Sequence, residues 1–485
     1  MADTVSLPIW AALLVAALAA WAVLERLLIP SGRWFIRRRV NRVIDELNTR
    51  LQLEIPAFHR TRRQILVDRL TYDPAIAAAV DAEARASGTP REVLHREIER
   101  YAREIVPSFN AYAYFRIGYY LARRTVQLLY RVRLGYADDA ALADIEPNAS
   151  VVFVMNHRSN MDYVLVAYMA ANRSALSYAV GEWARTWPLQ TLIKSLGAYF
   201  VRRNSGNPLY RLVLARYVQA ATAAGVVQAV YPEGGLSRDG GLRPPRLGLI
   251  NYMVSAFDPD GERDLVFVPV GINYDRVLED RSLVRALDAH AAPRSRRFVV
   301  ATVGRFVGRS VVLMLRRRWF RFGYACVNFG APISMRAYGA GRGVDFRALD
   351  DDARFAAVER FGGELLQAIA AAIPVLPVSV LATVFVRDPE RAMSVLEIKA
   401  RAQSLIEALA TRGAYVHIPR ADHDYAVTVG LRMLILRRFV RESEGLYRAD
   451  PEQRAMLRYY ANAIAHFLDD GVAGCAADPG VSQKS

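Results

Sequence analysis

The pattern of apolar and polar positions changes twice along the chain. Between about residues 40 and 125 the apolar residues recur at the spacing of amphipathic helices, and one stripe consists of Leu94, Ile98, Tyr101, Ala102 and Ile105. From about residue 145, short apolar runs alternate with helical segments such as 207–224. That alternation is typical of a sheet covered by helices. After about residue 335 the pattern is helical again.

The short runs are rich in β-branched and aromatic residues, which suits buried strands. They lie at 151–155, 175–180, 197–201, 226–231, 265–274, 297–304 and 324–330. The uncharged segment 373–386 is too short to span a membrane, so we expect a buried helix or core segment there. These patterns predict an α/β fold with a parallel or mixed sheet, helices on both its faces, and helical regions before and after it. The predicted boundaries are 1–30 for an N-terminal anchor, 31–140 for a helical region, 141–335 for the α/β domain and 336–485 for a C-terminal helical domain.

The N-terminal segment has the composition of a membrane helix. Residues 6–24 carry no charge, and their length is about that needed to cross the apolar core of a bilayer. Arginines follow this segment rather than precede it, so we expect an uncleaved anchor, a cell (inner) membrane location and a catalytic domain on the cytoplasmic side. A helix buried in the protein, or one lying in the membrane interface, is the alternative interpretation.

Charge narrows the class of partner. The chain has 64 Lys and Arg against 48 Asp and Glu, a formal net charge of +16, which indicates an acidic partner. Residues 110–133 contain five arginines, no acid and several tyrosines, and 313–323 have similar chemistry. Basic aromatic helices of this kind suit anionic membrane lipids, although a solvated basic face has the same composition. No zinc-finger or RNA-recognition signature accompanies the charge, so we expect no nucleic-acid partner. The two cysteines are too few for a disulfide framework or a thiolate metal site.

A histidine and an aspartate stand five positions apart where the strand at 151–155 ends. Within one helix this spacing turns the two side chains about 140° apart, so His157 and Asp162 can meet only if His157 lies in a loop before the helix. Ser159 and Asn160 are good N-cap residues, which would leave Asp162 near the first turn. A loop histidine beside an ionised aspartate is a general-base arrangement. A surface histidine in a turn is the alternative for an isolated pair.

Three further strand ends carry polar or turn-forming groups. Arg202 and Arg203 follow the strand at 197–201, and Glu233, Gly234, Ser237 and Arg238 follow the strand at 226–231. Open α/β sheets bind ligands at the carboxyl ends of their strands. Guanidinium groups, a hydroxyl and glycine-flanked backbone N–H groups suit a phosphate monoester. The strand at 265–274 adds an apolar lip with Pro269.

Four segments in this order resemble the motif blocks of the glycerolipid acyltransferases, most closely the large bacterial glycerol-3-phosphate acyltransferase branch. The segments are NHRSNMDY at 156–163, GAYFVRR at 197–203, YPEGGLSR at 231–238 and VPVGINY at 268–274. Later segments at 327–333, 377–385 and 457–467 are also similar to that branch, so the resemblance covers roughly residues 100–470. One departure is Leu236, which stands where the branch often has arginine.

The resemblance implies a membrane-associated enzyme that transfers a fatty acyl group from an acyl thioester, acyl-CoA or acyl carrier protein, to the sn-1 hydroxyl of glycerol 3-phosphate. His157 would accept the hydroxyl proton and Asp162 would orient His157. The alcohol would attack directly, because no G-x-S-x-G elbow offers an acyl-enzyme nucleophile. No metal or cofactor is implied. The residues expected to bind substrates are Arg158, Ser159, Arg202, Arg203, Glu233, Gly234, Ser237, Arg238 and Pro269.

Two alternatives stay open. The acceptor could be dihydroxyacetone phosphate or lysophosphatidate, since each also carries a phosphate. A protein of another class, a catalytically silent membrane lipid-binding protein, would retain the same charge pattern. The sequence does not choose between the two thioester donors.

Overall fold

The computed structural model describes residues 58, 61–110, 114, 118–170, 176–181, 189–202, 205–288 and 322–468. The anchor segment 1–30 and the expected strand at 297–304 lie outside the described residues. Within the described part of the chain, no helix is both long enough and apolar enough to cross a membrane.

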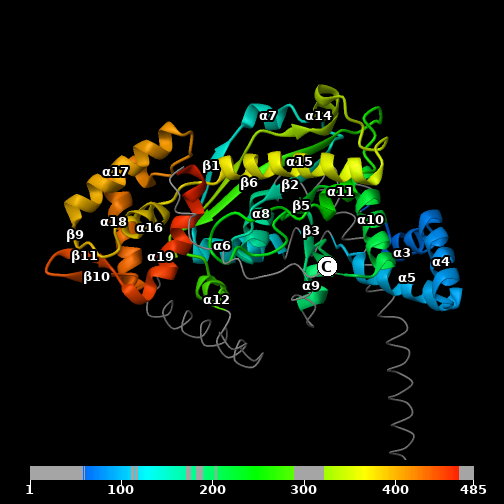
Figure 1. Cartoon of the computed structure of the whole chain (residues 1–485), viewed down its shortest axis with the longest axis horizontal. Helices are drawn as coiled ribbons and strands as arrows, with labels where there is room; N and C mark the ends of the chain where they lie inside the picture. The colour runs from blue at the N-terminus through cyan, green and yellow to red at the C-terminus, as the bar shows by residue number, and fades with distance from the viewer. Residues whose placement is uncertain are drawn as a thin grey trace, which may run out of the picture.

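A mixed eight-stranded sheet forms the centre of the described structure (Figure 1). Its strands run in the order β1-β7-β6-β2-β5-β3-β4, and β8 pairs with β6. Their bounds are β1 Arg131–Ala137, β2 Ser150–Met155, β3 Ser177–Val180, β4 Tyr199–Phe200, β5 Gln228–Val230, β6 Leu265–Tyr274, β7 Tyr324–Phe329 and β8 Ile333–Ser334. Strands β6, β2, β5, β3 and β4 run parallel to one another, and β1 runs parallel to β7, whereas β7 and β8 pair with β6 antiparallel. The carboxyl ends of the five parallel strands therefore meet at one edge.

Side chains of the strands alternate between two apolar cores, as the period of two in a strand requires. Val152 and Val154 of β2 belong to one core, together with α10 Pro208–Ala223, α11 Gly248–Val254, α14 Met335–Arg342 and α15 Asp351–Ala372. Met155 belongs to the other, which includes residues of α6 Tyr119–Leu129 and α8 Met161–Ala170. The predicted α/β architecture, with helices on both faces of a mixed sheet, is confirmed.

Helices α3 Arg63–Thr71, α4 Pro74–Ser87 and α5 Arg91–Ile105 lie at the β4 end of the sheet (Figure 1). The buried residues of α5 are the five of the predicted stripe, which confirms that helical face. The expectation of one helix over 110–133 is wrong at its end, because α6 stops at Leu129 and residues 131–137 form β1. Three short helices, α7 Asp139–Ala143, α9 Leu189–Ser195 and α12 Asp280–Arg285, occupy connections.

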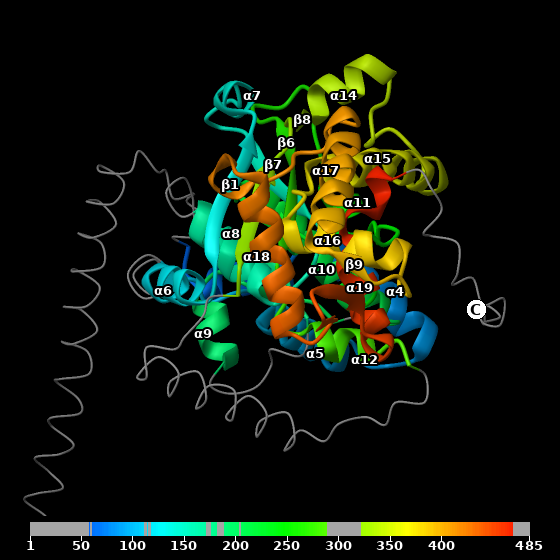
Figure 2. The same cartoon turned by 90° about the vertical axis from the view of Figure 1, so that its left-hand side faces the viewer.

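The C-terminal region packs against the other end of the sheet and faces the viewer in Figure 2. It contains α16 Pro377–Arg387, α17 Val395–Thr411, α18 His423–Leu436, α19 Arg454–Ala461 and the 3-10 helix η5 Asn462–Phe467. Helix α16 is buried along nearly its whole length, so the prediction for the uncharged segment 373–386 is confirmed. The region is not purely helical as expected, because β9 Met393–Ser394, β10 Val440–Ser443 and β11 Leu446–Ala449 form a small second sheet.

Candidate active site

The loop after β2 is tied to the neighbouring strand before it reaches the histidine. The Asn156 side-chain amide donates to the Ile272 carbonyl oxygen at 2.9 Å and its oxygen accepts from the Ile272 N–H at 2.8 Å. This reciprocal pair replaces ladder hydrogen bonds where β2 ends and β6 continues. The loop therefore leaves the sheet from an anchored point, with His157 as its next residue.

His157 and Asp162 meet as the loop–helix argument predicts. Nδ1 of His157 lies 2.9 Å from Oδ2 of Asp162, and the two residues are 3% and 0% exposed. The same Oδ2 accepts the backbone N–H groups of Arg158 at 2.7 Å and Ser159 at 2.9 Å. Oδ1 accepts the Tyr274 hydroxyl at 2.6 Å. Four donors thus surround a buried carboxylate, which makes its charge tolerable inside the protein.

Tyr274 was not among the predicted site residues, although it ends the VPVGINY segment. Burial first, and then the nearby Asp162 charge, raise the pKa of Tyr274 well above its ordinary value, so the hydroxyl stays protonated and donates. Two more tyrosines enclose the imidazole. The Tyr231 ring lies 4.1 Å from the His157 ring centroid, and Tyr163 meets it edge-on at 5.4 Å. Together with the Asp162 hydrogen bond, these rings hold the imidazole plane in one orientation.

The turn after β5 supports the same loop from the other side. Oε1 of Glu233 accepts the His157 N–H at 3.0 Å and Oε2 accepts the Arg243 N–H at 3.2 Å. Burial raises the pKa of Glu233 to about 7, although these backbone donors and the charges of Arg158 and Arg243 oppose that change. Gly234 has a φ of +68°, and a side chain there would start 2.6 Å from Cδ of Arg246, so any other residue at this turn would be strained.

Ser237 stabilises the loop rather than presenting a free hydroxyl. Its backbone N–H donates to the His157 carbonyl oxygen at 2.9 Å. Its Oγ lies 2.7 Å from the Gly241 carbonyl oxygen and accepts the Gly240 N–H at 3.0 Å. Leu236 beside it is partly exposed, and Arg238 is exposed.

Ser159 and Asn160 are held by a residue that the sequence did not single out. Glu279, between β6 and α12, accepts the Ser159 hydroxyl at 2.7 Å and the Asn160 amide at 3.1 Å. The Ser159 Oγ also accepts the Met161 N–H at 3.1 Å, as a helix-capping side chain does. No motif contains Glu279, and no signal in a single sequence could have found it.

Arg202 does not lie with the histidine. Its strand, β4, is separated from β2 by β5 and β3, roughly 14 Å at the usual spacing of about 4.8 Å per strand. The guanidinium donates to both carboxylate oxygens of Glu104 in α5, at 2.9 and 2.7 Å. In the structure this bidentate pair occupies the Arg202 side chain. Arg203 lies outside the described residues.

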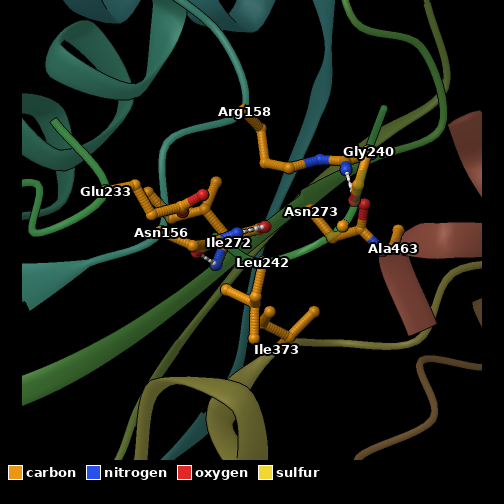
Figure 3. A pocket seen from close by; sticks show the side chains of 10 residues that line it. Asn156, Arg158, Glu233, Gly240, Leu242, Ile272, Asn273, Ile373 and Ala463 are labelled. Atoms are coloured by element: carbon orange, nitrogen blue, oxygen red, sulfur yellow. Dashed lines mark hydrogen bonds between the residues drawn. The ribbon is translucent and has the colours of Figure 1, made fainter. Parts of the chain in front are cut away.

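Pro269 and Arg158, two further predicted site residues, are both buried. Pro269 was expected at an apolar lip, but it is buried in the middle of β6, in register with Val154 of β2. Arg158 is 3% exposed, and it lines a small pocket together with Glu233, Asn156 and Ala463 (Figure 3). Among the described residues, no group of three or more His, Cys, Asp or Glu could hold a metal ion.

Two family models match the chain. The model for the acyltransferase family matches residues 140–273, which run from within α7 through β2 and its loop almost to the end of β6. The model for the glycerol-3-phosphate acyltransferase C-terminal region matches residues 310–473. The first therefore contains His157, Asp162 and Glu233, and the second contains the α16–α19 region.

Curated bacterial proteins named glycerol-3-phosphate acyltransferase are similar over most of the chain. The protein of Xylella fastidiosa (strain M23) is 26% identical over 443 residues, which is 89% of this chain and 50% of that protein. The protein of Xanthomonas axonopodis pv. citri (strain 306) is 24% identical over 442 residues, 89% of this chain and 49% of that protein. The chain spans about half the length of these relatives. The chain is therefore similar to the bacterial glycerol-3-phosphate acyltransferases over 89% of its length, and its residues 140–273 match the acyltransferase family model.

Proposed function

We propose that the chain transfers a fatty acyl group from an acyl thioester to the sn-1 hydroxyl of glycerol 3-phosphate, giving lysophosphatidic acid for phospholipid synthesis. The observation that carries the proposal is the buried His157–Asp162 pair at the carboxyl edge of the parallel strands. The names of the relatives and the two family models support the choice of acceptor.

The hydrogen-bond geometry assigns the role of each nitrogen of His157. The Asp162 carboxylate can only accept a hydrogen bond from Nδ1 of His157. Nδ1 therefore carries the hydrogen, and Nε2 is the unprotonated nitrogen that acts as the base. Nε2 takes the proton of the acceptor hydroxyl as its oxygen forms a bond to the thioester carbonyl carbon. The tetrahedral intermediate then breaks its C–S bond, and the imidazolium returns the proton to the leaving sulfur. Asp162 stabilises the positive imidazole between the two steps.

The loop contacts explain why this pair is pre-organised. His157 receives support at its backbone N–H from Glu233, at its carbonyl oxygen from Ser237, and at its ring from Tyr231. The pair therefore need not rearrange when substrate binds, which lowers the reorganisation cost of the proton transfer.

The remaining predicted residues keep the proposed role of shaping the substrate site. Arg158, Ser159, Glu233 and Gly234 lie in or beside the His157 loop, and Arg238 extends from the turn after β5. Arg202 and Arg203 follow β4 at the far end of the parallel strands, so a phosphate role for them requires a substrate that reaches from His157 across β5 and β3.

Purified full-length protein should be offered glycerol 3-phosphate, dihydroxyacetone phosphate and lysophosphatidate, each with labelled acyl-CoA and with acyl carrier protein thioester. We expect the highest kcat/KM with glycerol 3-phosphate. A preference of tenfold or more for either other acceptor, about 1.4 kcal/mol in transition-state binding, would make the acceptor assignment wrong and leave acyl transfer intact. Thioester consumption with water alone would point to a hydrolase.

We also propose that the protein works at the cytoplasmic surface of the cell membrane. Helix α6 exposes Tyr120, Leu121 and Leu128 beside exposed Arg123 and Arg124, a composition that suits an anionic lipid surface. Deleting residues 1–30 should release only part of the protein from membranes at low salt, with the rest released at high salt. Complete release at low salt would contradict the second contact.

A further inference from the structure

Arg158 carries a buried guanidinium with one edge unused. The residue is 3% exposed, and its Nη1 donates to the carbonyl oxygen of Gly240. Nε and Nη2 have no hydrogen-bond partner among the described residues. The N–H groups of these two nitrogens point the same way, and this edge grips two oxygens of a phosphate or carboxylate at once. A buried charged group whose hydrogen bonds are unmade destabilises the folded protein, which points to a ligand at this edge.

The surroundings favour an anion. Arg158 borders the pocket described above from the side opposite Leu242 and Ile373 (Figure 3). Glu233 also lines this pocket, but its two oxygens accept the backbone N–H groups of His157 and Arg243 and do not pair with Arg158. Burial raises the pKa of Glu233 to about 7, which leaves it partly neutral at physiological pH. The guanidinium is thus the dominant charge of the pocket.

Two segments distant in the sequence hold the guanidinium in place. Its carbon lies 4.8 Å from the ring centroid of Tyr459 in α19, within cation–π distance. Gly240 accepts its hydrogen bond and packs so closely on α19 that a Cβ there would overlap the Tyr459 carbonyl oxygen. Nearby, the Asn462 amide donates to the Asp239 carbonyl oxygen at 3.0 Å. The C-terminal region therefore forms one wall around Arg158.

The other candidate arginines are less suited to the same task. Arg202 is paired with Glu104 and lies three strands from β2. Arg238 is exposed, where an ion pair contributes little. Arg158 is covalently next to His157, and its own N–H donates to Asp162. An anion gripped by Arg158 would therefore be fixed relative to the proposed base.

We propose that the free edge of Arg158 binds the phosphate of the acceptor substrate, and that Tyr459 is a positioning residue which holds the guanidinium in this orientation. The identity of the ligand rests on the proposed function. The inference adds which arginine takes the phosphate, and it gives the C-terminal region a part in acceptor binding.

The test measures binding and catalysis on the full chain. Binding of glycerol 3-phosphate by calorimetry should weaken tenfold or more in Arg158→Gln and Arg158→Lys, because neither side chain offers the two-pronged edge. Arg342→Gln is the matched control, since it removes one positive charge from the exposed surface of α14. Kinetically, the KM for glycerol 3-phosphate should rise in both Arg158 variants, with the KM for the thioester within about twofold of the wild type.

Tyr459 offers a conservative pair of variants. Its hydroxyl has no hydrogen-bond partner among the described residues, so Tyr459→Phe keeps the ring and should bind glycerol 3-phosphate like the wild type. Tyr459→Leu loses the ring and should raise the acceptor KM severalfold. A purely structural role for Tyr459 would instead lower kcat in proportion to the folded fraction and leave the KM unchanged.

Each of the following outcomes either supports or overturns the assignment of the phosphate to Arg158. Acceptor binding within threefold of the wild type in folded Arg158 variants would overturn the inference. Should both Arg158 variants fail to fold, an unchanged acceptor KM in Tyr459→Leu would overturn it. Inorganic phosphate separates the inference from the proposed reaction: phosphate binding that is lost in the Arg158 variants, without acylation of glycerol 3-phosphate by the wild type, supports the anion site and refutes the reaction. Acylation of glycerol 3-phosphate with an unchanged acceptor KM in the Arg158 variants supports the reaction and refutes the anion site.

Discussion

The loop after β2 and the turn after β5 leave neighbouring strands at the same edge of the sheet, and each buries a carboxylate. Asp162 is 0% exposed and accepts four hydrogen bonds, one of them from a tyrosine hydroxyl. Glu233 is 3% exposed and accepts two backbone N–H groups. Burial raises the pKa of Glu233 to about 7. The number and strength of donors, rather than burial alone, decides what a carboxylate in this edge can do: Asp162 can support a charged histidine, whereas Glu233 mainly holds the loop.

His157→Ala should have the largest effect, because it removes the proposed base itself from the carboxylate that accepts four hydrogen bonds. We expect kcat to fall by about 10² to 10⁴, the usual range for general acid–base catalysis, in a variant that still folds. Initial rates with glycerol 3-phosphate and a labelled thioester measure this. Activity within a few-fold of the wild type would contradict general-base catalysis by His157.

Tyr274→Phe removes one donor from Asp162 and leaves the ring packing intact. A hydrogen bond to a charged group contributes about 1.5–3 kcal/mol, so kcat should fall by roughly 10- to 100-fold. Tyr130→Phe is the matched control: its hydroxyl is also buried, but it donates to the Arg276 carbonyl oxygen at 2.8 Å. Equal losses in the two variants would mean that the effect is general packing rather than support of Asp162.

Glu233→Gln should change how stability depends on pH. The folded-state pKa of Glu233 is raised from 4.5 to about 7, so its contribution to stability is complete below about pH 4.5 and is lost as the pH rises to about 7. Relative to the wild type, the variant should therefore gain roughly 2–4 kcal/mol in free energy of unfolding from pH 5 to pH 8. Thermal unfolding midpoints at both pH values test this, with Glu364→Gln on the surface of α15 as the control. A difference between variant and wild type that is the same at pH 5 and pH 8 would contradict the assignment.

Arg238→Ala should have the smallest effect of the four. The side chain extends into solvent from the turn after β5, and exposed charge interactions contribute about 0–1 kcal/mol. We expect the KM for glycerol 3-phosphate to rise less than about fivefold, and less than in the Arg158 variants measured in parallel. A larger rise in this KM than in Arg158→Lys would indicate that the phosphate binds at the turn after β5 rather than at Arg158.

Local patterns were sufficient for much of the fold and for the centre of the site. The bounds expected for the longest strand, 265–274, are those of β6, and the apolar stripe of α5 is buried as predicted. The His157–Asp162 contact also followed from local rules, because helix geometry left only one way for residues five apart to meet. Such inferences succeed because periodicity and capping depend on neighbours along the chain.

Strand order and distant partners depend on the tertiary structure. The sequence placed four polar segments at strand ends, but only the order β6-β2-β5-β3-β4 shows that His157 lies beside Glu233 and far from Arg202. Glu104, which pairs with Arg202, comes from a helix some 98 residues earlier in the chain, and Tyr459 meets Arg158 from the C-terminal region. These contacts pair residues with no shared periodicity, so a single sequence contains no signal for them. The chain thus specifies by itself which chemical groups are available, and the packing of the sheet against its helical regions decides which of them act together.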